Sequence, residues 1–258
     1  MSELIIITDD GPVRTVRMNR PDKKNALTMM MYDVMAAGIE SAGTNSALRC
    51  LLIAGAPTVF CAGNDIGDFL KAAGEGGALG PPILRFLYAL ARCEKPLVAA
   101  VQGGAIGIGA TMLLHCDHVV ASSEARFSTP FVSLGLVPEF ASSLVVPQLL
   151  GRVKASEKLL LGEPFSPAEA VEWRIANAVL PAGEVLNHAR RIAERFNALP
   201  PGAVRDTKRL LQRASADQLL QAIAAENEVF GARLSGPEAA EAFSAFFQKR
   251  KPDFSTFQ

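Results

Sequence analysis

The stretch KPLVAAVQGGAIGIGATMLLHCDHVVASSEARFSTPFVSLGLVPE, residues 95–139, decides the fold of this chain. It begins with the short apolar run Leu97 to Val101, which is typical of a buried strand. Gly103 and Gly104 interrupt this run, and an apolar helix is predicted to open near Ile106. The first turn of a helix carries backbone N–H groups without a partner, and the helix dipole adds partial positive charge there. The turn before this helix is therefore a candidate anion site.

The same stretch ends in a lone acidic residue. After the helix, the sequence predicts a second strand and a loop bounded by proline, and Glu139 follows that loop in otherwise uncharged surroundings. We expect the backbone donors of the turn and this carboxylate to meet on one substrate. The alternative for Glu139 taken alone is an exposed loop acid.

Composition and charge restrict the class of protein. The chain has 258 residues, of which 49% are apolar and 20% charged, as in a globular protein with a large core. Its 26 basic residues balance 26 acidic ones, so no nucleic acid or anionic membrane is expected as a partner. The apolar runs are shorter than the roughly 20 residues that cross a bilayer. Neither a signal peptide at the N-terminus nor a peroxisomal address at the C-terminus is recognisable, so a cytoplasmic protein is predicted.

Cysteine and histidine residues give no metal or redox motif. The four cysteines lack CxxC spacing and are predicted to be buried free thiols, and Cys61 has no nearby histidine to activate it as a nucleophile. The three histidines have no metal-ligand spacing, so no metal site is predicted. The glycines of GGAIGIG do not fit the GxGxxG frame of a dinucleotide site.

The rest of the chain alternates strands and helices and then becomes helical, which favours an α/β core with a helical C-terminal part. Asp65 is predicted to cap a helix, and the Gly-rich segment Gly74 to Pro82 is predicted to be either a mobile entrance to the site or a plain surface loop. Strands are predicted at 4–8, 13–18, 50–55 and 178–180. Helices are predicted at 28–42, 83–93, 142–150, 154–161 and 166–174, and three or four more are predicted from 182 onward. The apolar face of the helix at 28–42 is predicted to carry Leu27, Met31, Val34, Met35 and Ile39.

Five segments, in this order, resemble the crotonase superfamily, the enoyl-CoA hydratase/isomerase family: NRPDKKNAL, FCAGNDI, KPLVAAVQGGAIGIGATMLLHCD, ARFSTPFVSLGLVPE and LLLGEPFSPAEAVEWRIANAVL. The resemblance covers nearly the whole chain. It implies an α/β fold, the crotonase (ClpP-like) spiral of repeated ββα units, over residues 1–199. Residues 200–258 would form a helical region that packs on the core and in a homotrimer or a dimer of trimers. The implied substrate is an acyl-CoA, and no separate cofactor is expected because coenzyme A enters as part of the substrate.

The resemblance also implies roles for single residues. The backbone N–H groups of Asn64 and Ile108 would hold the thioester oxygen of the substrate, and Glu139 would move the proton. Asp65 is expected to cap a helix, to contact coenzyme A, or both. The lysine pair Lys23 and Lys24 would either contact the phosphates of coenzyme A or be solvated surface residues. The substrate and coenzyme A contacts implied are Lys24, Ala62, Gly63, Asp65, Ile66 and Phe131.

Two departures from the family pattern narrow the predicted reaction. Hydratases of this family use two glutamates, and Thr111 and Phe131 stand at those two positions here. The remaining acid, Glu139 in LGLVPE, resembles the single catalytic glutamate of the Δ3,Δ2-enoyl-CoA isomerase branch. The sequence therefore predicts an isomerase of fatty acid metabolism that converts 3-enoyl-CoA to 2-trans-enoyl-CoA. Alternatives are weak hydration, isomerisation of a ring-derived CoA thioester, or a non-catalytic acyl-CoA-binding paralogue.

Overall fold

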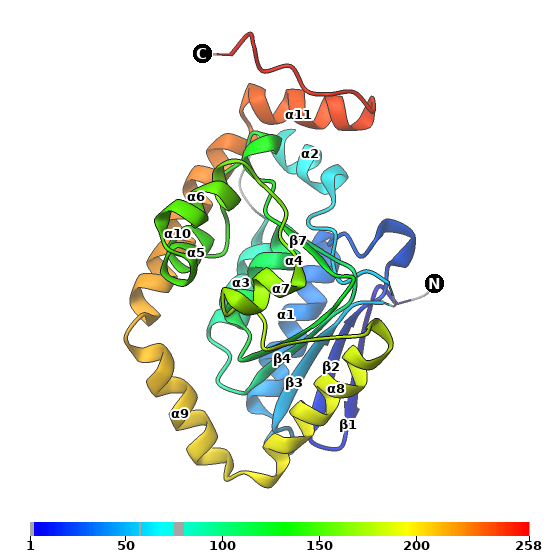
Figure 1. Cartoon of the computed structure of the whole chain (residues 1–258), viewed down its shortest axis with the longest axis vertical. Helices are drawn as coiled ribbons and strands as arrows, with labels where there is room; N and C mark the ends of the chain where they lie inside the picture. The colour runs from blue at the N-terminus through cyan, green and yellow to red at the C-terminus, as the bar shows by residue number, and fades with distance from the viewer. Residues whose placement is uncertain (1–2, 57, 75–79, 258) are drawn as a thin grey trace.

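One six-stranded sheet forms the centre of the computed structural model, which describes residues 3–56, 58–74 and 80–257 (Figure 1). The strand order is β1-β2-β3-β4-β6-β8; β1 is antiparallel to β2, and all other neighbours are parallel. The Gly-rich segment predicted to be an entrance or a surface loop falls largely in 75–79, outside the described residues. The strands are β1 (Ile5–Asp10), β2 (Val13–Met18), β3 (Cys50–Ala54), β4 (Leu97–Val101), β6 (His118–Ser122) and β8 (Ala178–Leu180).

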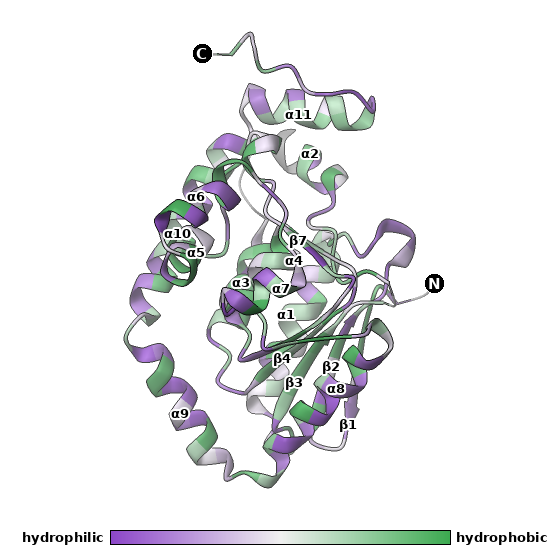
Figure 2. Ribbon diagram, in the orientation of Figure 1, coloured by the Kyte–Doolittle hydropathy of each residue, from purple (hydrophilic) through white to green (hydrophobic). Residues whose placement is uncertain are grey.

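Helices cover both faces of this sheet. Helix α8 (Ala182–Arg195) packs on one face, where its small residues contact Leu52 of β3 and Val98 of β4. The alternate residues of the same strands, such as Ile53, point to the other face and into the larger core with α1 (Met29–Thr44) and α3 (Pro81–Ala91). Strands buried on both sides are expected to be continuously apolar, as β3 and β4 are (Figure 2).

Short extended segments form a second layer beside the main sheet. Strand β5 (Gly104–Ile106) pairs in parallel with β7 (Arg126–Ser128), and single bridges join Cys61 to Ala105 and Leu27 to Asn64. Each main strand from β2 to β6 is thus followed by a short extended segment and then by helical structure. This repetition is the ββα pattern predicted from the sequence.

The start of the central helix differs from the sequence prediction. Residues 104–106 form β5 instead of opening a helix near Ile106, because Cys61 binds both Gly104 O and Ile106 N through its backbone, each at 2.9 Å. The helix begins two residues later as α4 (Ile108–Thr111) and continues as the 3-10 turn η2 (Met112–His115). Val34 was placed on the apolar face of α1 by its spacing, but the structure leaves it exposed.

The second half of the described chain is mostly helical, as predicted. The predicted boundary at residues 199 and 200 falls between η4 and α9, and the separate roles of the two regions stay a prediction. The remaining elements are η1 (Pro21–Lys23), α2 (Ile66–Gly74), η3 (Val132–Leu134), α5 (Ser142–Leu150), α6 (Arg152–Leu160), α7 (Pro167–Glu172), η4 (Phe196–Ala198), α9 (Pro201–Arg213), α10 (Ala216–Leu234) and α11 (Pro237–Phe247).

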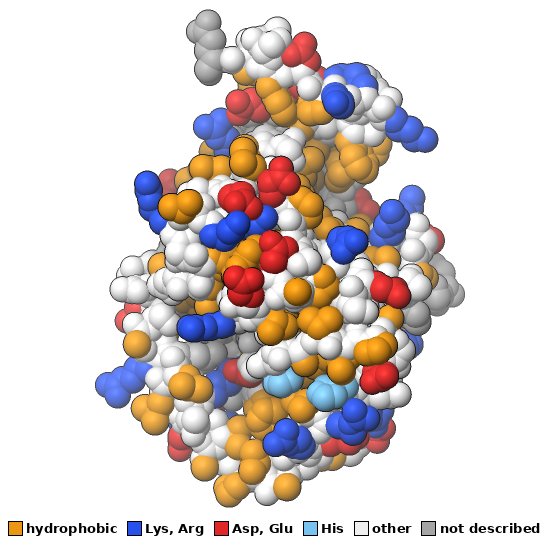
Figure 3. All heavy atoms as spheres, viewed as in Figure 1, with side chains coloured by type: hydrophobic (Ala, Val, Ile, Leu, Met, Phe, Trp, Pro, Cys, Tyr) orange, Lys and Arg blue, Asp and Glu red, His pale blue; other side chains and the backbone are white. Residues whose placement is uncertain are grey.

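The surface carries both signs of charge. Basic and acidic side chains are interspersed over the face shown in Figure 3, in agreement with the zero net charge of the chain. In the part of the chain that the structure describes, no helix is long and apolar enough to span a bilayer. All four cysteines are free thiols; Cys50, Cys61 and Cys93 are buried as predicted, whereas Cys116 is half-buried.

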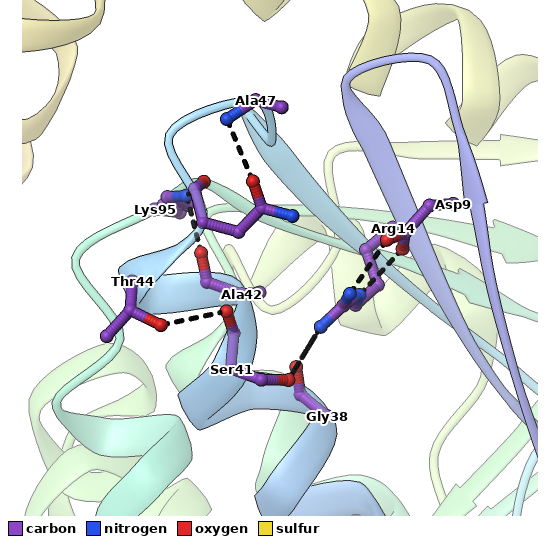
Figure 4. A network of polar contacts seen from close by, with 9 residues as sticks. Asp9, Arg14, Gly38, Ser41, Ala42, Thr44, Ala47 and Lys95 are labelled. Carbon is purple, nitrogen blue, oxygen red and sulfur yellow. Dashed lines mark hydrogen bonds and ion pairs between the residues drawn. The ribbon is translucent and has the colours of Figure 1, made fainter.

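Polar contacts fix α1 against the sheet (Figure 4). Arg14 of β2 pairs with Asp9 and also donates to the Gly38 carbonyl and the Ser41 hydroxyl of α1. The buried Lys95 donates through Nζ to the carbonyls of Ala42 and Asn45 at the end of α1. Carbonyls at a helix C-terminus lack an intrahelical partner, so this ammonium group acts as a cap from another part of the chain.

We expect Lys95→Met to lower the free energy of unfolding by about 1–3 kcal/mol, because the capped carbonyls stay buried without their donor. Urea denaturation followed by circular dichroism measures this change. Lys251→Met, at an exposed lysine, is the matched control and should leave stability unchanged within error. Equal midpoints for the two variants would show that the Lys95 cap does not contribute to stability.

Candidate active site

The site is built where two turns from different repeats lie against each other. Two residues after the Cys61–Ala105 bridge, the chain passes through Gly63 with φ 99° and through Gly107 with φ 54°. These are left-handed conformations that glycine adopts without a steric cost. A Cβ added to Gly107 would lie only 3.9 Å from the Cα of Gly63, so the two turns are in contact. The next residue in each turn is one of the two predicted donors.

The backbone N–H groups of these two donors are unoccupied. Asn64 N and Ile108 N donate to no other described residue, whereas the neighbouring Asp65 N binds Leu27 O at 2.9 Å and Gly107 N binds Ser128 O at 2.9 Å. Ile108 is the first residue of α4, where a backbone N–H has no intrahelical partner. The structure therefore brings the two predicted donors to adjacent turns with free N–H groups.

Glu139 is buried beside these turns and is not an exposed loop acid. Only 2% of its surface is exposed, Oε1 accepts a hydrogen bond from the Asn64 side-chain amide at 3.4 Å, and Oε2 has no partner among the described residues. Burial, with a smaller contribution from the charge of Glu226, raises the pKa of Glu139 from 4.5 to about 8. A carboxyl group with this pKa takes up and releases a proton near neutral pH.

The side chain of Asn64 links Glu139 to a tyrosine that the sequence analysis missed. Tyr32, in the first turn of α1, donates its hydroxyl hydrogen to the side-chain oxygen of Asn64, whose amide nitrogen faces Glu139. Tyr32 is buried, and burial raises the pKa of its phenol well above 10, so the hydroxyl stays protonated. A buried phenol needs a polar partner, and a polar position in the otherwise apolar face of α1 was the available signal.

Thr111 and Phe131, the two positions where the family's hydratases have glutamates, are both buried. The Thr111 hydroxyl has no partner among the described residues. The Phe131 ring lies at the edge of the donor turn, 3.9 Å from where a Cβ on Gly107 would be. Leu136 and Phe140 are also buried, in the same large core cluster as Phe131.

The predicted coenzyme A contacts lie along the loop beside the first donor. Lys24 is exposed, and its carbonyl accepts from Ala62 N at 3.0 Å, which places the lysine loop against the residues before Asn64. Asp65 caps α2, as predicted, because its Oδ1 accepts from the backbone of Gly67 at 2.9 Å. Its other oxygen pairs with Arg20 at 2.7 Å. Ile66, half-buried, begins α2, and Lys23 is exposed.

His115 lies beside this arrangement and contacts the residue that follows Glu139. His115 is buried, stacks on Phe140 at a ring distance of 3.7 Å, and its Nε2 contacts the Phe140 carbonyl. Burial lowers the pKa of His115 to about 4, so the ring is neutral. No three metal-ligating side chains gather anywhere in the described ranges.

This arrangement is typical of a class of enzyme site. Two free N–H groups on adjacent turns can stabilise an oxyanion, and a nearby carboxyl group with a raised pKa can move a proton. The fold around the site is the crotonase fold. In agreement, the family model for enoyl-CoA hydratase/isomerase matches residues 9–257, and this chain belongs to that family.

Known relatives include both isomerases and hydratases. The chain is 33% identical over 255 residues to rat enoyl-CoA delta isomerase 2, covering 97% of this chain and 65% of that protein. It is also 33% identical to the short-chain-enoyl-CoA hydratase of Clostridium acetobutylicum, covering 96% of this chain and 95% of the relative. The structure of Pseudomonas aeruginosa OdaA superposes with a TM-score of 0.92 at 47% identity, over 95% of this chain and 99% of the other.

We expect Glu139→Gln to stabilise the protein increasingly as pH rises from about 5 to about 8. Above its usual pKa of 4.5, Glu139 ionises in the unfolded chain but stays protonated when buried, so wild-type stability falls with pH until the folded pKa is passed. Each unit of pKa difference corresponds to about 1.4 kcal/mol. Urea unfolding at a series of pH values tests this, with the exposed Glu172→Gln as control. A constant difference between variant and wild type across this range would contradict a raised pKa of Glu139.

Proposed function

We propose that this enzyme is an isomerase that converts a 3-enoyl-CoA thioester to its conjugated 2-trans isomer. The observation that carries the proposal is the buried Glu139 carboxyl group beside two free backbone donors, with no acid at position 111 or 131, where Thr111 and Phe131 stand. Moving a double bond by one position requires one group that removes a proton and returns it elsewhere. Adding water requires a further group that activates the water.

The reaction begins with loss of a proton from C2 of the substrate. The thioester oxygen accepts hydrogen bonds from Asn64 N and Ile108 N, and the Glu139 carboxylate removes the C2 proton. The electron pair of the C2–H bond then becomes delocalised as an enolate whose oxygen carries the negative charge. Preorganised donors stabilise that charge, and the loss of one such donor typically costs about 3–4 kcal/mol.

The second half returns the same proton to C4. Glu139, now protonated, donates to C4, and the electrons shift to form the double bond between C2 and C3. A pKa of about 8 suits both halves, because the carboxylate is basic enough to accept the proton and the acid is strong enough to donate it. The apolar surroundings of Phe131 and Phe140 limit exchange of the proton with water.

Glu139→Gln should lower kcat for 3-hexenoyl-CoA by at least about a thousandfold, because the amide cannot accept the C2 proton. The increase in ultraviolet absorbance on conjugation measures the rate. For the wild type, kcat/KM should rise about tenfold per pH unit below a pKa of about 8 and then level off.

Glu172→Gln, an exposed variant with the same charge change, should retain the wild-type rate. Comparable turnover by Glu139→Gln and wild type would remove Glu139 from the mechanism.

Hydration is the second candidate, because the Clostridium relative carries a hydratase name at the same identity as the isomerase relative. We expect that, in water enriched in heavy oxygen, 2-enoyl-CoA gives no labelled 3-hydroxyacyl product while 3-enoyl-CoA is still isomerised. Mass spectrometry of the products measures the label.

Label that enters the product at a rate comparable to isomerisation would favour the hydratase. Turnover of a ring-derived thioester alone would favour that class of substrate. Tight acyl-CoA binding without exchange of the C2 hydrogen in deuterated buffer would indicate a non-catalytic paralogue.

A further inference from the structure

The backbone directly after Glu139 is strained. Phe140 has φ 61° and Ala141 has φ 56°, two consecutive left-handed residues that are not glycine. Such conformations cost free energy and persist only where surrounding contacts hold them. Both residues are fully buried, so the contacts around this turn determine where the Glu139 side chain lies.

The contact that holds this turn comes from the C-terminal helical region. Glu226 of α10 is 85 residues away from Ala141 in the chain, and its Oε2 accepts from the Ala141 backbone N–H. Its Oε1 accepts from the backbone N–H of Ser143 at 2.8 Å and from the Ser143 hydroxyl. Glu226 is 8% exposed; its hydrogen bond with Ala141 is buried and its two with Ser143 are partly buried. Hydrogen bonds to a carboxylate are stronger than those between neutral groups.

Glu226 supplies a cap that the local sequence lacks. Helix α5 follows the strained turn, and Ala141 at its N-cap position has no side chain able to bind the first N–H groups. Such groups need an acceptor when they are buried. The Glu226 carboxylate provides it from α10, and thereby ties α10 to the turn that carries Glu139.

Other contacts complete the turn but come from neighbouring residues of the core. The Ser142 hydroxyl donates to the Glu139 carbonyl at 2.7 Å, and His115 binds the Phe140 carbonyl at 2.9 Å. Besides burial, Glu226 and Asn64 influence the pKa of Glu139, and the charge of Glu139 in turn raises the pKa values of Tyr32 and Cys61. In the described ranges neither Glu139 nor Glu226 forms an ion pair.

We infer that Glu226 is a positioning residue for Glu139: from α10 it holds the strained turn at 140–141 and so fixes the place of the carboxylate relative to the donor turns. The inference rests on the proposed function for its kinetic consequence. It assigns the C-terminal helical region an indirect part in the reaction, through a side chain that acts on the position of Glu139.

Glu226→Gln tests this role, because glutamine keeps the size of the side chain but replaces one acceptor oxygen with a donor. We expect kcat for 3-hexenoyl-CoA to fall roughly tenfold to a hundredfold with KM changed less than about twofold, since a misplaced proton carrier affects chemistry more than binding. Glu228→Gln, at an exposed position on the same helix, is the matched control and should match wild type. Equal kcat for Glu226→Gln and Glu228→Gln, with both folded, would overturn the inference.

A second readout does not need turnover. Carbon NMR of protein labelled at the glutamate carboxyl carbon, with the Glu139 signal assigned by its loss in Glu139→Gln, gives the pKa of Glu139 directly. We expect Glu226→Gln to lower that pKa, because a nearby negative charge is removed. An unchanged pKa together with an unchanged chemical shift of Glu139 would overturn the inference.

The two readouts separate failure of the inference from failure of the proposed function. If wild type does not isomerise 3-hexenoyl-CoA, the proposed function fails, and the carboxyl chemical shift of Glu139 in Glu226→Gln still tests whether the place of Glu139 depends on Glu226. If Glu226→Gln does not fold, Ser143→Ala replaces it, because this change removes the hydroxyl donor to Glu226 and leaves both backbone contacts. A smaller effect in the same direction on kcat and on the Glu139 signal would support the role, and no effect on either would overturn it.

Discussion

The backbone pairing of Cys61 with Ala105 is the contact on which the rest of the site depends. It joins two repeats that are 44 positions apart in the chain, and the two N–H donors follow three residues later in each repeat. Two hydrogen bonds of 2.9 Å hold the pairing, each worth only about 1 kcal/mol in net stability. Their larger effect is geometric, because they bring two glycine turns into van der Waals contact. Gly109 in α4 makes the approach possible, since a Cβ there would lie 2.6 Å from Cys61 O.

The close approach of the two repeats explains the glycine pattern of the central stretch, and a bound nucleotide is not needed to explain it. The glycines of GGAIGIG permit backbones to approach one another and permit a left-handed turn before Ile108. Phosphate-binding glycine motifs serve a different purpose, since there the backbone approaches a ligand. In this chain, glycines at a similar spacing are therefore explained by contacts within the protein.

Elements that depend on neighbouring residues were predicted correctly from the sequence. Elements and side-chain contacts that depend on distant segments of the chain were missed. The apolar runs of β3 and β4, the hairpin at β1 and β2, and the cap of α2 by Asp65 follow from neighbouring residues and were found. Strand β5 was missed because residues 104–106 are extended only through their bonds to Cys61. Tyr32 and Glu226 were missed for the same reason, since their partners lie 32 and 85 positions away. A single sequence can mark a polar position in an apolar helix face, as at Tyr32, but it does not name the distant partner.

Burial of Glu139 lowers the stability of the protein and raises the pKa of the carboxyl group. A carboxyl group in apolar surroundings with one oxygen unpartnered costs folding free energy, and this cost grows once the group ionises. Among the described residues no cation pairs with Glu139. A paired carboxylate would have a low pKa and would hold a proton poorly. Instead Asn64 offers one weak hydrogen bond, and Glu226 places a further negative charge nearby while stabilising the adjacent turn. These contacts fix the position of the carboxyl group without removing its affinity for a proton, which is the combination that a proton shuttle requires.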